Sequence, residues 1–201
     1  MSSNCTKRKY SYGYGQNWWV HFLIEQEYFG DDLVFVSGKQ SIILDMTYKI
    51  NKDVKHSDVP GQIADCSQFE WYFTLQNRNT SSAGHGRYMW FGLNLFDNRD
   101  AGKVDAEYNG TELGSGIWIY RPGSSKAFVG RNTLPAVGET VHVRLDITSA
   151  IQNAFNNAVN NGCMPNTKFS DLAIGAMNIG YETHSGRETS VTVYDCNIYY
   201  K

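Results

Sequence analysis

Hydrophobic and polar residues alternate along many short segments of this chain, and Gly, Asn, Asp and Ser separate the segments. Alternation with a period of two is typical of strands that bury one face. A long series of such segments favours an all-β sandwich of two antiparallel sheets over βαβ units. The expected strands are Trp18–Glu25, Leu33–Ser37, Ser41–Ile50, Phe69–Gln76, Arg87–Phe96, Gly116–Arg121, Lys126–Val129, Val141–Ile147, Leu172–Tyr181 and Ser190–Tyr200.

One segment has helical rather than strand periodicity. Ile151, Ala154, Phe155, Ala158 and Val159 recur at the spacing of a buried helix stripe. A hydroxyl of residue 148 or 149 is suited to cap the start, and a glycine at 162 followed by a proline at 165 ends the pattern. We expect this helix to be structural and to pack its apolar stripe against a sheet.

The alternation assigns the side chains of each strand to two faces, because successive residues point to opposite sides. Three strands combine a hydrophobic face with a second face that carries rings and amides. The hydrophobic sets are Phe69, Trp71, Phe73 and Leu75; Met89, Phe91, Leu93 and Leu95; and Ile117 with Ile119. The opposing sets are Glu70, Tyr72, Thr74 and Gln76; Tyr88, Trp90, Gly92 and Asn94; and Trp118 with Tyr120.

This second face is too aromatic for ordinary solvent-facing surface and too polar for a core, and it suits a carbohydrate. Sugar C–H groups stack on aromatic rings, and amides or carboxylates hydrogen-bond the hydroxyls. Rigid rings also limit the ordering cost of binding. The alternative is a second core that the helix or loops cover. The expected ligand-binding residues are Tyr72, Gln76, Tyr88, Trp90, Asn94, Trp118, Tyr120, Asn178 and Glu182, with Glu70 as a further hydrogen-bonding group.

Composition narrows the choice of partners. The 201 residues suit one large domain spanning 1–201, and the net charge of −2 gives no field that would attract nucleic acid or an anionic membrane. No apolar run reaches the roughly 18 residues of a membrane span. Aromatic residues make up 14% of the chain, which the ring-lined face explains. We therefore expect a polysaccharide or oligosaccharide ligand, no nucleic acid, no membrane, and a monomer or a part of a larger multimodular protein.

The four cysteines and the acidic residues bear on location and cofactors. Cys5, Cys66, Cys163 and Cys196 form no C-x-x-C pair, so a cysteine-based zinc site is not expected. Their even number is compatible with two disulfides, with three pairings open, and it favours an extracellular location. No cofactor is expected, although clustered oxygens could hold a structural calcium. The aspartates that could serve are Asp31, Asp32, Asp45 and Asp195.

The C-terminal quarter has the most specific pattern. A helix, Gly162 and a proline-containing loop precede the segment LAIGAMNIGYE, which ends at Glu182; a Ser-Gly turn and a Thr-Val strand follow. This order resembles the end of the small single-helix jelly-roll endoglucanases and, more loosely, of the related xylanases. The resemblance implies a concanavalin A-like jelly roll, in which the glutamate that matches Glu182 is the general acid/base. The same architecture also serves lectins and carbohydrate-binding modules.

The second carboxylate that this family needs is missing from its usual place. A retaining glycosidase requires a nucleophilic carboxylate about 5–5.5 Å from the acid/base. The family pattern places it in a Glu-x-Met-x-Trp setting, whereas residues 88–92 here read YMWFG. Glu70, on the polar face of the neighbouring strand, is the substitute that the chain offers.

The sequence is therefore compatible with three functions. The leading interpretation is non-catalytic binding of a β-linked polysaccharide on the ring-lined face. The alternative is an endo-acting glycoside hydrolase of β-glucanase or xylanase type, with Glu182 as acid/base and Glu70 as its partner. The third is a structural or adhesion sandwich that binds a protein partner.

Overall fold

The computed structural model describes residues 2–4, 20–28, 33–57, 66–112, 115–183 and 186–201. Two antiparallel sheets form a jelly-roll sandwich, so the predicted fold class is confirmed. The strands are β1 (Ser2–Asn4), β2 (Val20–Glu27), β3 (Val34–Phe35), β4 (Ile42–Ser57), β5 (Ser67–Asn77), β6 (Tyr88–Asp97), β7 (Tyr108–Thr111), β8 (Trp118–Arg121), β9 (Thr140–Asp146), β10 (Leu172–Thr183) and β11 (Gly186–Tyr200).

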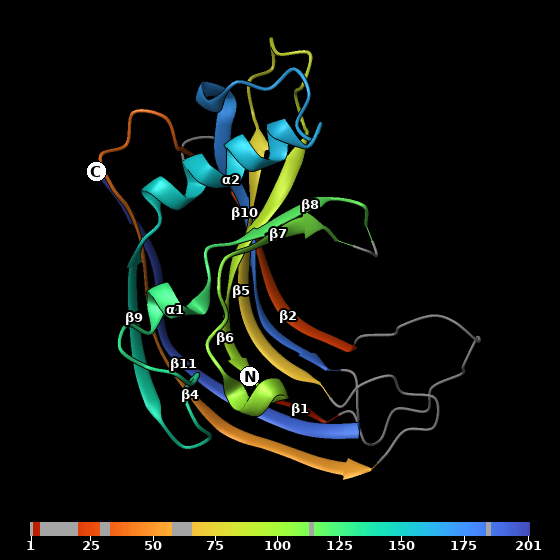
Figure 1. The fold of residues 1–201 in the computed structure, drawn as a ribbon, viewed down its shortest axis with the longest axis vertical. Coiled ribbons are helices and arrows are strands. Elements are labelled where there is room, and N and C mark those ends of the chain that lie inside the picture. The colour runs from red at the N-terminus through yellow and green to blue at the C-terminus, as the bar shows by residue number, and fades with distance from the viewer. Residues whose placement is uncertain (1, 5–19, 29–32, 58–65, 113–114, 184–185) are drawn as a thin grey trace, which may run out of the picture.

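The two sheets differ in size and position. One has four strands in the order β1-β11-β4-β9, and the other has seven, in the order β2-β10-β5-β6-β8-β7, with β3 also paired to β10. Figure 1 shows the larger sheet curving so that its hollow side faces away from the smaller sheet. Nearly all strand pairs are antiparallel, but β8 runs parallel to β6, with Ile119 beside Trp90. This pairing places Ile119 on the same side of the sheet as Trp90.

The hydrophobic side chains of the alternating pattern fill the space between the sheets. Tyr48 connects the two sheets, because its buried hydroxyl on β4 donates to the carbonyl of Leu95 on β6 at 2.7 Å. The largest fully buried side chains are Trp71, Tyr48, Tyr120, Tyr181, Phe69, Phe73, Phe91, Ile42, Leu44, Met46, Ile50 and Leu75. The core faces predicted for 69–76 and 87–96 are therefore confirmed.

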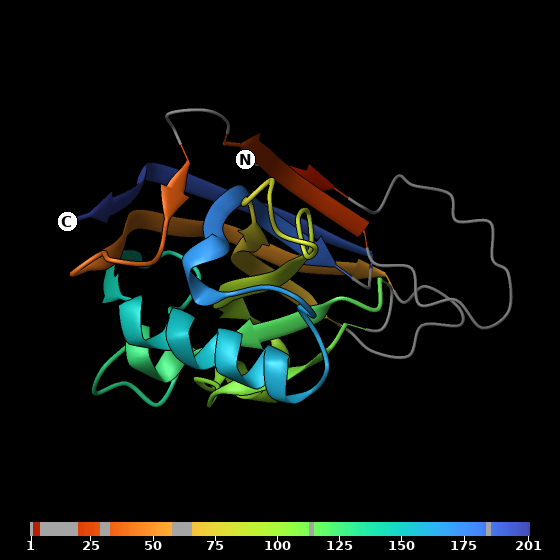
Figure 2. The ribbon, with the colours of Figure 1, turned by 90° about the horizontal axis from the view of Figure 1, so that it is seen from above.

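The predicted helix is present as α2 (Thr148–Asn160), which lies across one end of the sandwich (Figures 1 and 2). Its buried stripe includes Ile151, Ala154 and Phe155, which belong to the core. The side chain of Asp146, rather than a hydroxyl at 148 or 149, receives the first free backbone N–H: that of Thr148 donates to Asp146 Oδ1 at 2.9 Å. Ile147 is the residue that precedes the helix and makes no side-chain capping bond, so the capping hydroxyl expected at 148 or 149 is not found.

The strand predicted at Lys126–Val129 is wrong. The chain forms the short helix α1 (Ser124–Ala127) there. Gly123 takes a φ of 90°, and the Ser124 N–H donates to Asp105 Oδ1 at 2.6 Å, so the backbone turns instead of extending. Two further turns are 3-10 helices, η3 (Arg99–Gly102) and η4 (Phe169–Asp171). The pattern had also missed the short strands β1 and β7.

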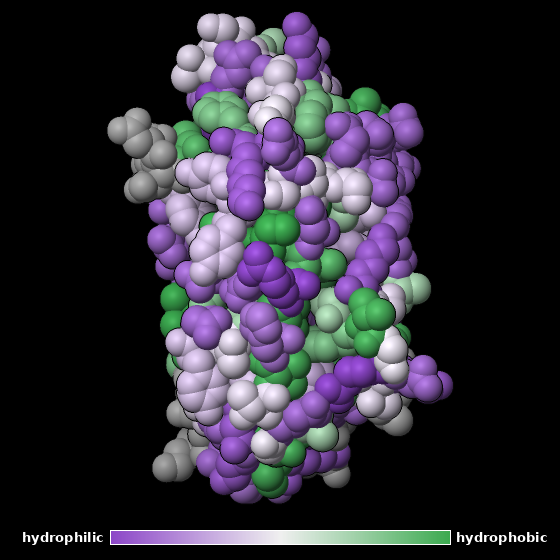
Figure 3. Space-filling view, turned by 90° about the vertical axis from the view of Figure 1, so that its left-hand side faces the viewer, coloured by the Kyte–Doolittle hydropathy of each residue, from purple (hydrophilic) through white to green (hydrophobic). Residues whose placement is uncertain are grey.

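The outer face of the four-stranded sheet is mostly polar, and Figure 3 shows scattered hydrophobic residues among hydrophilic ones on this side. On β4 and β9 the outward residues form ion pairs: Asp45 accepts from His142 at 2.9 Å and also contacts Arg144. We call this surface, marked by Asp45, His142, Arg144 and Tyr199, the outer face.

The two disulfides with which the cysteine count is compatible do not form. Cys66, Cys163 and Cys196 are free thiols, so two disulfides are not present. Cys5 lies outside the described residues, as do Trp18, Asp31 and Asp32. Of the part of the chain that the structure covers, no helix is long and apolar enough to cross a membrane.

Candidate functional site

The register of the seven-stranded sheet brings polar residues of several strands together on its hollow side, which we call the concave face. Glu182 on β10 lies opposite Gln68 on β5. In the next rows, Gly180 lies beside Glu70 and Glu70 beside Asn94, while Asn178 lies beside Tyr72 and Tyr72 beside Gly92. A further row joins Ala176, Thr74 and Trp90. The concave face is therefore a grid whose rows run across β10, β5 and β6.

Glu70 and Glu182 are diagonal neighbours in this grid. They stand on adjacent strands, two positions apart, and both point to the concave face. Diagonal neighbours of an antiparallel pair have α-carbons about 7–8 Å apart, which lets two glutamate side chains converge. The structure therefore joins the two carboxyl groups that the sequence analysis singled out.

The surroundings of the two carboxyl groups disfavour a second negative charge. Burial, followed by the charge of Glu182, raises the pKa of Glu70 to about 8, although Arg121 opposes this. Burial also raises the pKa of Glu182, against the effect of His21, whose Nε2 is 3.7 Å from Glu182 Oε1. Interacting carboxyls lose their protons in steps that belong to the pair. Burial therefore favours the protonated form of both carboxyl groups, and the charge of Glu182 adds to this effect at Glu70.

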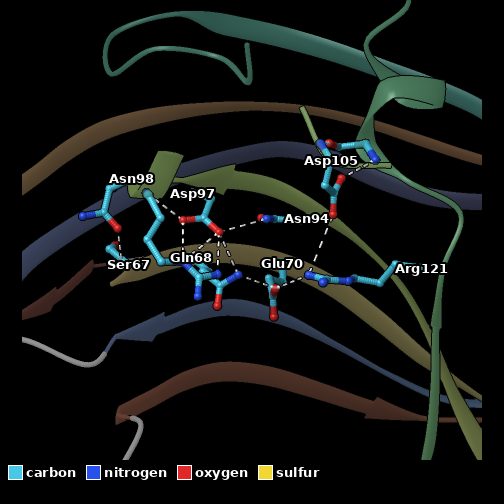
Figure 4. Close-up of polar contacts among 10 residues, drawn as sticks. Ser67, Gln68, Glu70, Asn94, Asp97, Asn98, Asp105 and Arg121 are labelled. Carbon is cyan, nitrogen blue, oxygen red and sulfur yellow. Dashed lines mark hydrogen bonds and ion pairs between the residues drawn. The ribbon is translucent and has the colours of Figure 1, made fainter. Parts of the chain in front are cut away.

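A hydrogen-bonded chain of polar side chains holds Glu70 from one side (Figure 4). The amide of Gln68 donates to Glu70 Oε1 at 3.2 Å and to Asp97 Oδ2 at 3.0 Å. Asn94 donates to the same Asp97 oxygen at 3.2 Å. Arg99 clamps Asp97 with its side chain, at 2.7 Å from Nη2 to Oδ2 and 3.0 Å from Nε to Oδ1. Each of Gln68, Glu70, Asn94 and Asp97 is less than 9% exposed.

Arg121 holds Glu70 from the other side. It reaches from β8, with Nη1 at 3.9 Å from Glu70 Oε1 and 3.8 Å from Asp105 Oδ2. Its guanidinium also lies over the ring of Tyr108, 4.9 Å from the centroid. The guanidinium charge, at similar distances from Glu70 and Asp105, favours the ionised form of Glu70 without forming a tight ion pair.

Two glycines make room for this arrangement. A Cβ on Gly92 would stand 2.2 Å from the ring of Tyr72, so the bare backbone of β6 lets that ring lie across it. A Cβ on Gly180 would meet the carbonyl of Phe22 at 2.0 Å, which keeps β2 and β10 close beside Glu70. Tyr72 is only 8% exposed as a result, on the face where alternation placed it.

Of the five predicted stacking rings, three lie on the concave face and two do not. Tyr88 and Trp90 are half-buried there and contact each other edge to face, with ring centroids 5.7 Å apart. The placement of Trp118 and Tyr120 is corrected: both belong to the core, at 8% and 0% exposed, and Tyr120 stacks on Phe91. Ile119, not Trp118 or Tyr120, shares the side of Trp90.

The predicted amide residues all lie on the concave face. Asn178 is half-buried next to Tyr72, and Gln76 accepts from Arg78 and donates to the carbonyl of Gly86. Asn94 turns its amide nitrogen to Asp97, and its buried Oδ1 has no partner. The site residues that the sequence analysis missed are Gln68, Asp97, Arg99, Arg121 and His21.

Neither a metal centre nor a deep pocket competes with this site. Among the described residues, no group of three or more His, Cys, Asp or Glu is arranged to hold a metal ion. Asp45 is paired with His142, and Asp195 accepts the N–H of Thr47. A groove lined by Ile43, Arg144 and Tyr199 lies on the four-stranded sheet, away from both glutamates. It is the less promising site because the buried, unpaired polar atoms near it are fewer than on the concave face.

Comparisons with known proteins find relatives by structure but not by sequence. No family model and no curated protein matches the chain. Among solved structures, a family 12 xyloglucanase from Bacillus licheniformis is 12% identical, with 85% of this chain and 66% of that chain covered and a TM-score of 0.45. A family 11 xylanase from Neocallimastix patriciarum is 11% identical, with 95% and 84% covered and a TM-score of 0.45.

A third structure, endoglucanase 3 of family 12 from Trichoderma harzianum, is 12% identical, with 84% of this chain and 66% of that chain covered and a TM-score of 0.44. The chain thus spans just under two thirds of two of these proteins. With identities of 11–12% and TM-scores of 0.44–0.45, these likenesses assign neither a family nor an activity to this chain.

Proposed function

We propose that the concave face binds a β-linked polysaccharide and that Glu70 and Glu182 hydrolyse it with retention of configuration. The observation that carries the proposal is the placement of two buried carboxyl groups on adjacent strands, facing the same side, with both pKa values raised. Perturbed carboxyl pairs of this kind are enriched at catalytic sites. A retaining mechanism needs its two carboxyl groups about 5–5.5 Å apart, a spacing that diagonal glutamates can reach.

The contacts of the two residues divide the roles. Glu70 accepts an N–H from Gln68 and faces Arg121, and both contacts favour its ionised form, so we assign Glu70 as the nucleophile and Glu182 as the acid/base. Glu182 then protonates the glycosidic oxygen while Glu70 attacks the anomeric carbon and forms a glycosyl-enzyme. Glu182, now ionised, takes a proton from water, which releases the sugar and restores Glu70.

The remaining residues of the concave face suit a sugar chain. Trp90 and Tyr88 offer half-exposed rings for stacking, and Asn178 lies between these rings and Glu182 along the face. The unpaired Oδ1 of Asn94 is an acceptor that a sugar hydroxyl would satisfy, since a buried acceptor without a donor costs free energy. Because polysaccharides of this kind lie outside cells, the proposal includes an extracellular location.

The test is a reducing-end assay against soluble β-glucans, xyloglucan, xylan and mannan. We expect turnover by the native chain and a loss of about 10²–10⁴-fold in Glu182→Gln and in Glu70→Gln. Glu188→Gln, on the outer face, is the matched control and should retain full activity. Added azide should rescue Glu182→Ala with a product of retained configuration and Glu70→Ala with an inverted one. Turnover that survives both Glu→Gln substitutions would refute the assignment.

One observation favours a second candidate, non-catalytic binding on the same face. Strand β6 carries its one concave carboxylate, Asp97, at its end. Its concave positions Tyr88, Trp90, Gly92 and Asn94, where the family that the C-terminal pattern resembles holds its nucleophile, have none. Affinity electrophoresis separates the two. Retardation by a glycan that the native chain never cleaves, abolished in Trp90→Ala, would establish binding alone.

A further inference from the structure

We propose that Gln68 is a positioning residue for Glu70, and that Asp97, anchored by Arg99, turns the Gln68 amide so that it always donates to that carboxylate. The proposal rests on the proposed function and deepens it, since it names the residues that keep the nucleophile oriented and ionised. None of these three residues belongs to the pattern by which the C-terminal quarter resembles known enzymes.

The orientation of the Gln68 amide follows from the hydrogen-bonding chemistry of its partners. An ionised aspartate has only acceptors, so the group that Gln68 presents to Asp97 must be the NH₂ end. The second hydrogen of that nitrogen then points to Glu70 Oε1, 3.2 Å away. With the amide flipped, its oxygen would face two carboxylates, which is repulsive. Gln68 is therefore a donor to Glu70 and cannot act as an acceptor there.

Asp97 is held more firmly than its neighbours. It accepts the backbone N–H of Arg99 at 2.8 Å, three contacts from the Arg99 side chain, and one N–H each from Gln68 and Asn94. These donors fix both oxygens, and the side chain is 10% exposed. A carboxylate whose two oxygens accept from this many donors is held in one orientation. Asp97 thus works as a fixed acceptor that selects one rotamer and one flip of Gln68.

The position of Gln68 in the sheet explains why this matters. It lies opposite Glu182 and two residues before Glu70, so it occupies the corner between the two carboxyl groups. Donation to Glu70 stabilises a negative charge there, whereas no such donor from Gln68 reaches Glu182. Burial alone disfavours the charged form of both groups, so the donor acts against burial at one of them only.

Other charged and titratable groups around Glu70 act in both directions. Those that favour its ionised form are Arg121 and Arg99, and those that oppose it are Glu182 and Asp97. Cys66 and Tyr72 lie nearby with pKa values raised by burial, so both are neutral at ordinary pH. Asp97 has a direct effect of its own charge on Glu70 as well as an effect through Gln68, and the experiment must separate the two.

A double-mutant cycle read by NMR makes this separation. The titration of Glu70 is followed through its side-chain carboxyl carbon in ¹³C-labelled protein, in the native chain, Gln68→Met, Asp97→Asn and the double variant. We expect Gln68→Met to raise the Glu70 midpoint by about one pH unit or more, because a hydrogen bond to a charged group is lost. In the Gln68→Met background, Asp97→Asn should lower the midpoint, since only a negative charge is removed.

With Gln68 present, Asp97→Asn should lower the midpoint by clearly less or raise it, because the amide is then free to turn away. The difference between the two backgrounds measures the effect that passes through Gln68. Asp45→Asn, which removes an arginine-paired aspartate from the outer face, is the control and should leave the midpoint unchanged. Equal shifts in both backgrounds, or no shift in Gln68→Met, would overturn the proposal.

The same variants tested for turnover distinguish this proposal from the proposed function. If the chain hydrolyses a glycan, both limbs of its pH–rate profile should move upward in Gln68→Met, which a loss of stability alone would not cause. If no glycan is cleaved while the NMR shifts appear, the positioning of Glu70 stands and the hydrolase proposal fails. Thermal unfolding of each variant shows that the measured species is folded.

Discussion

The concave face and the outer face of this sandwich come from the same kind of alternating strand, yet they treat carboxyl groups in opposite ways. On the outer face Asp45 and Glu188 pair with His142, Arg144, Lys52 and His56, and these hydrogen bonds lower both carboxyl pKa values. On the concave face burial raises the pKa values of both Glu70 and Glu182, and the charge of Glu182 raises that of Glu70 further.

The two faces therefore differ in how much their carboxyl groups cost in folding free energy. Exposed ion pairs add little stability and need no precise support. A buried pair of like charges reduces stability and persists only where the surroundings hold it, as Gln68, Asp97 and Arg121 do here. If this contrast is right, substitutions on the two faces should differ in the size and sign of their effects.

The largest effect should come from the core side of β8. Tyr120→Ala removes a fully buried ring that stacks on Phe91 and should lower the free energy of unfolding by about 3–5 kcal/mol. Trp90→Ala, on the concave side of the neighbouring strand, should lower it by less than half as much, because that ring is only half-buried. Urea denaturation of both variants is the measurement. Equal losses would return Tyr120 to the concave face.

The sequence alone could not show that Tyr120 faces the core. On β5 and β6 one face is uniformly apolar, so alternation identified the core side correctly. On β8 both faces are apolar or aromatic, Ile117 and Ile119 against Trp118 and Tyr120. Alternation separates two such faces but does not say which is inside. Only the parallel pairing with β6, a long-range contact, sets Tyr120 beside Phe91.

Asp97 was missed for a different reason. Continued alternation from Met89 through Leu95 would put Asp97 on the core side of β6. The pairing with β5 shifts between Phe69 and Glu70, so Leu95 is an extra residue and Asp97 falls opposite Gln68 on the concave side. The side on which Glu70 and Glu182 lie was predictable. The pairing of β10 with β5 has no bulge from Ala176 to Thr183, so alternation holds along both strands there.

The second effect in size concerns pH and stability. Glu70 binds its proton more tightly in the folded chain, so its stabilising contribution is present below its ordinary value of 4.5 and is lost as the pH rises through about 8. Glu70→Gln removes this loss. The variant should gain stability over the native chain between pH 5 and 9, on the order of 2 kcal/mol at the upper end.

Thermal unfolding across this range checks the sign, and Glu188→Gln is the matched control. The pKa of Glu188 is lowered by Lys52 and His56, so its contribution is present above its ordinary value and lost as the pH falls. Its substitution should therefore destabilise at neutral pH and have no effect in acid. The same sign for both variants would remove the contrast between the faces.

The third effect is on glycan affinity. If sugars stack on the concave face, Trp90→Ala should weaken binding by about 3–10-fold, the worth of one well-placed ring. Tyr199→Ala removes a more exposed ring from the outer face, where it is 49% exposed and lies near Arg144. That variant should bind as the native chain does. A loss in Tyr199→Ala alone, measured by isothermal titration calorimetry, would move the binding surface to the other sheet.

The smallest effect should come from the ion pairs of the outer face. Asp45→Asn breaks contacts to His142 and Arg144, which are both 55% exposed, so solvent and salt already screen most of the attraction. We expect a decrease in Tm of at most about 3 °C, which 0.5 M NaCl should largely abolish. By contrast, salt should leave the Glu70→Gln difference nearly intact, because that carboxyl is buried and poorly screened. Equal salt sensitivity of the two variants would mean that solvent reaches Glu70 as freely as Asp45, and the raised pKa values on the concave face would then lose their physical cause.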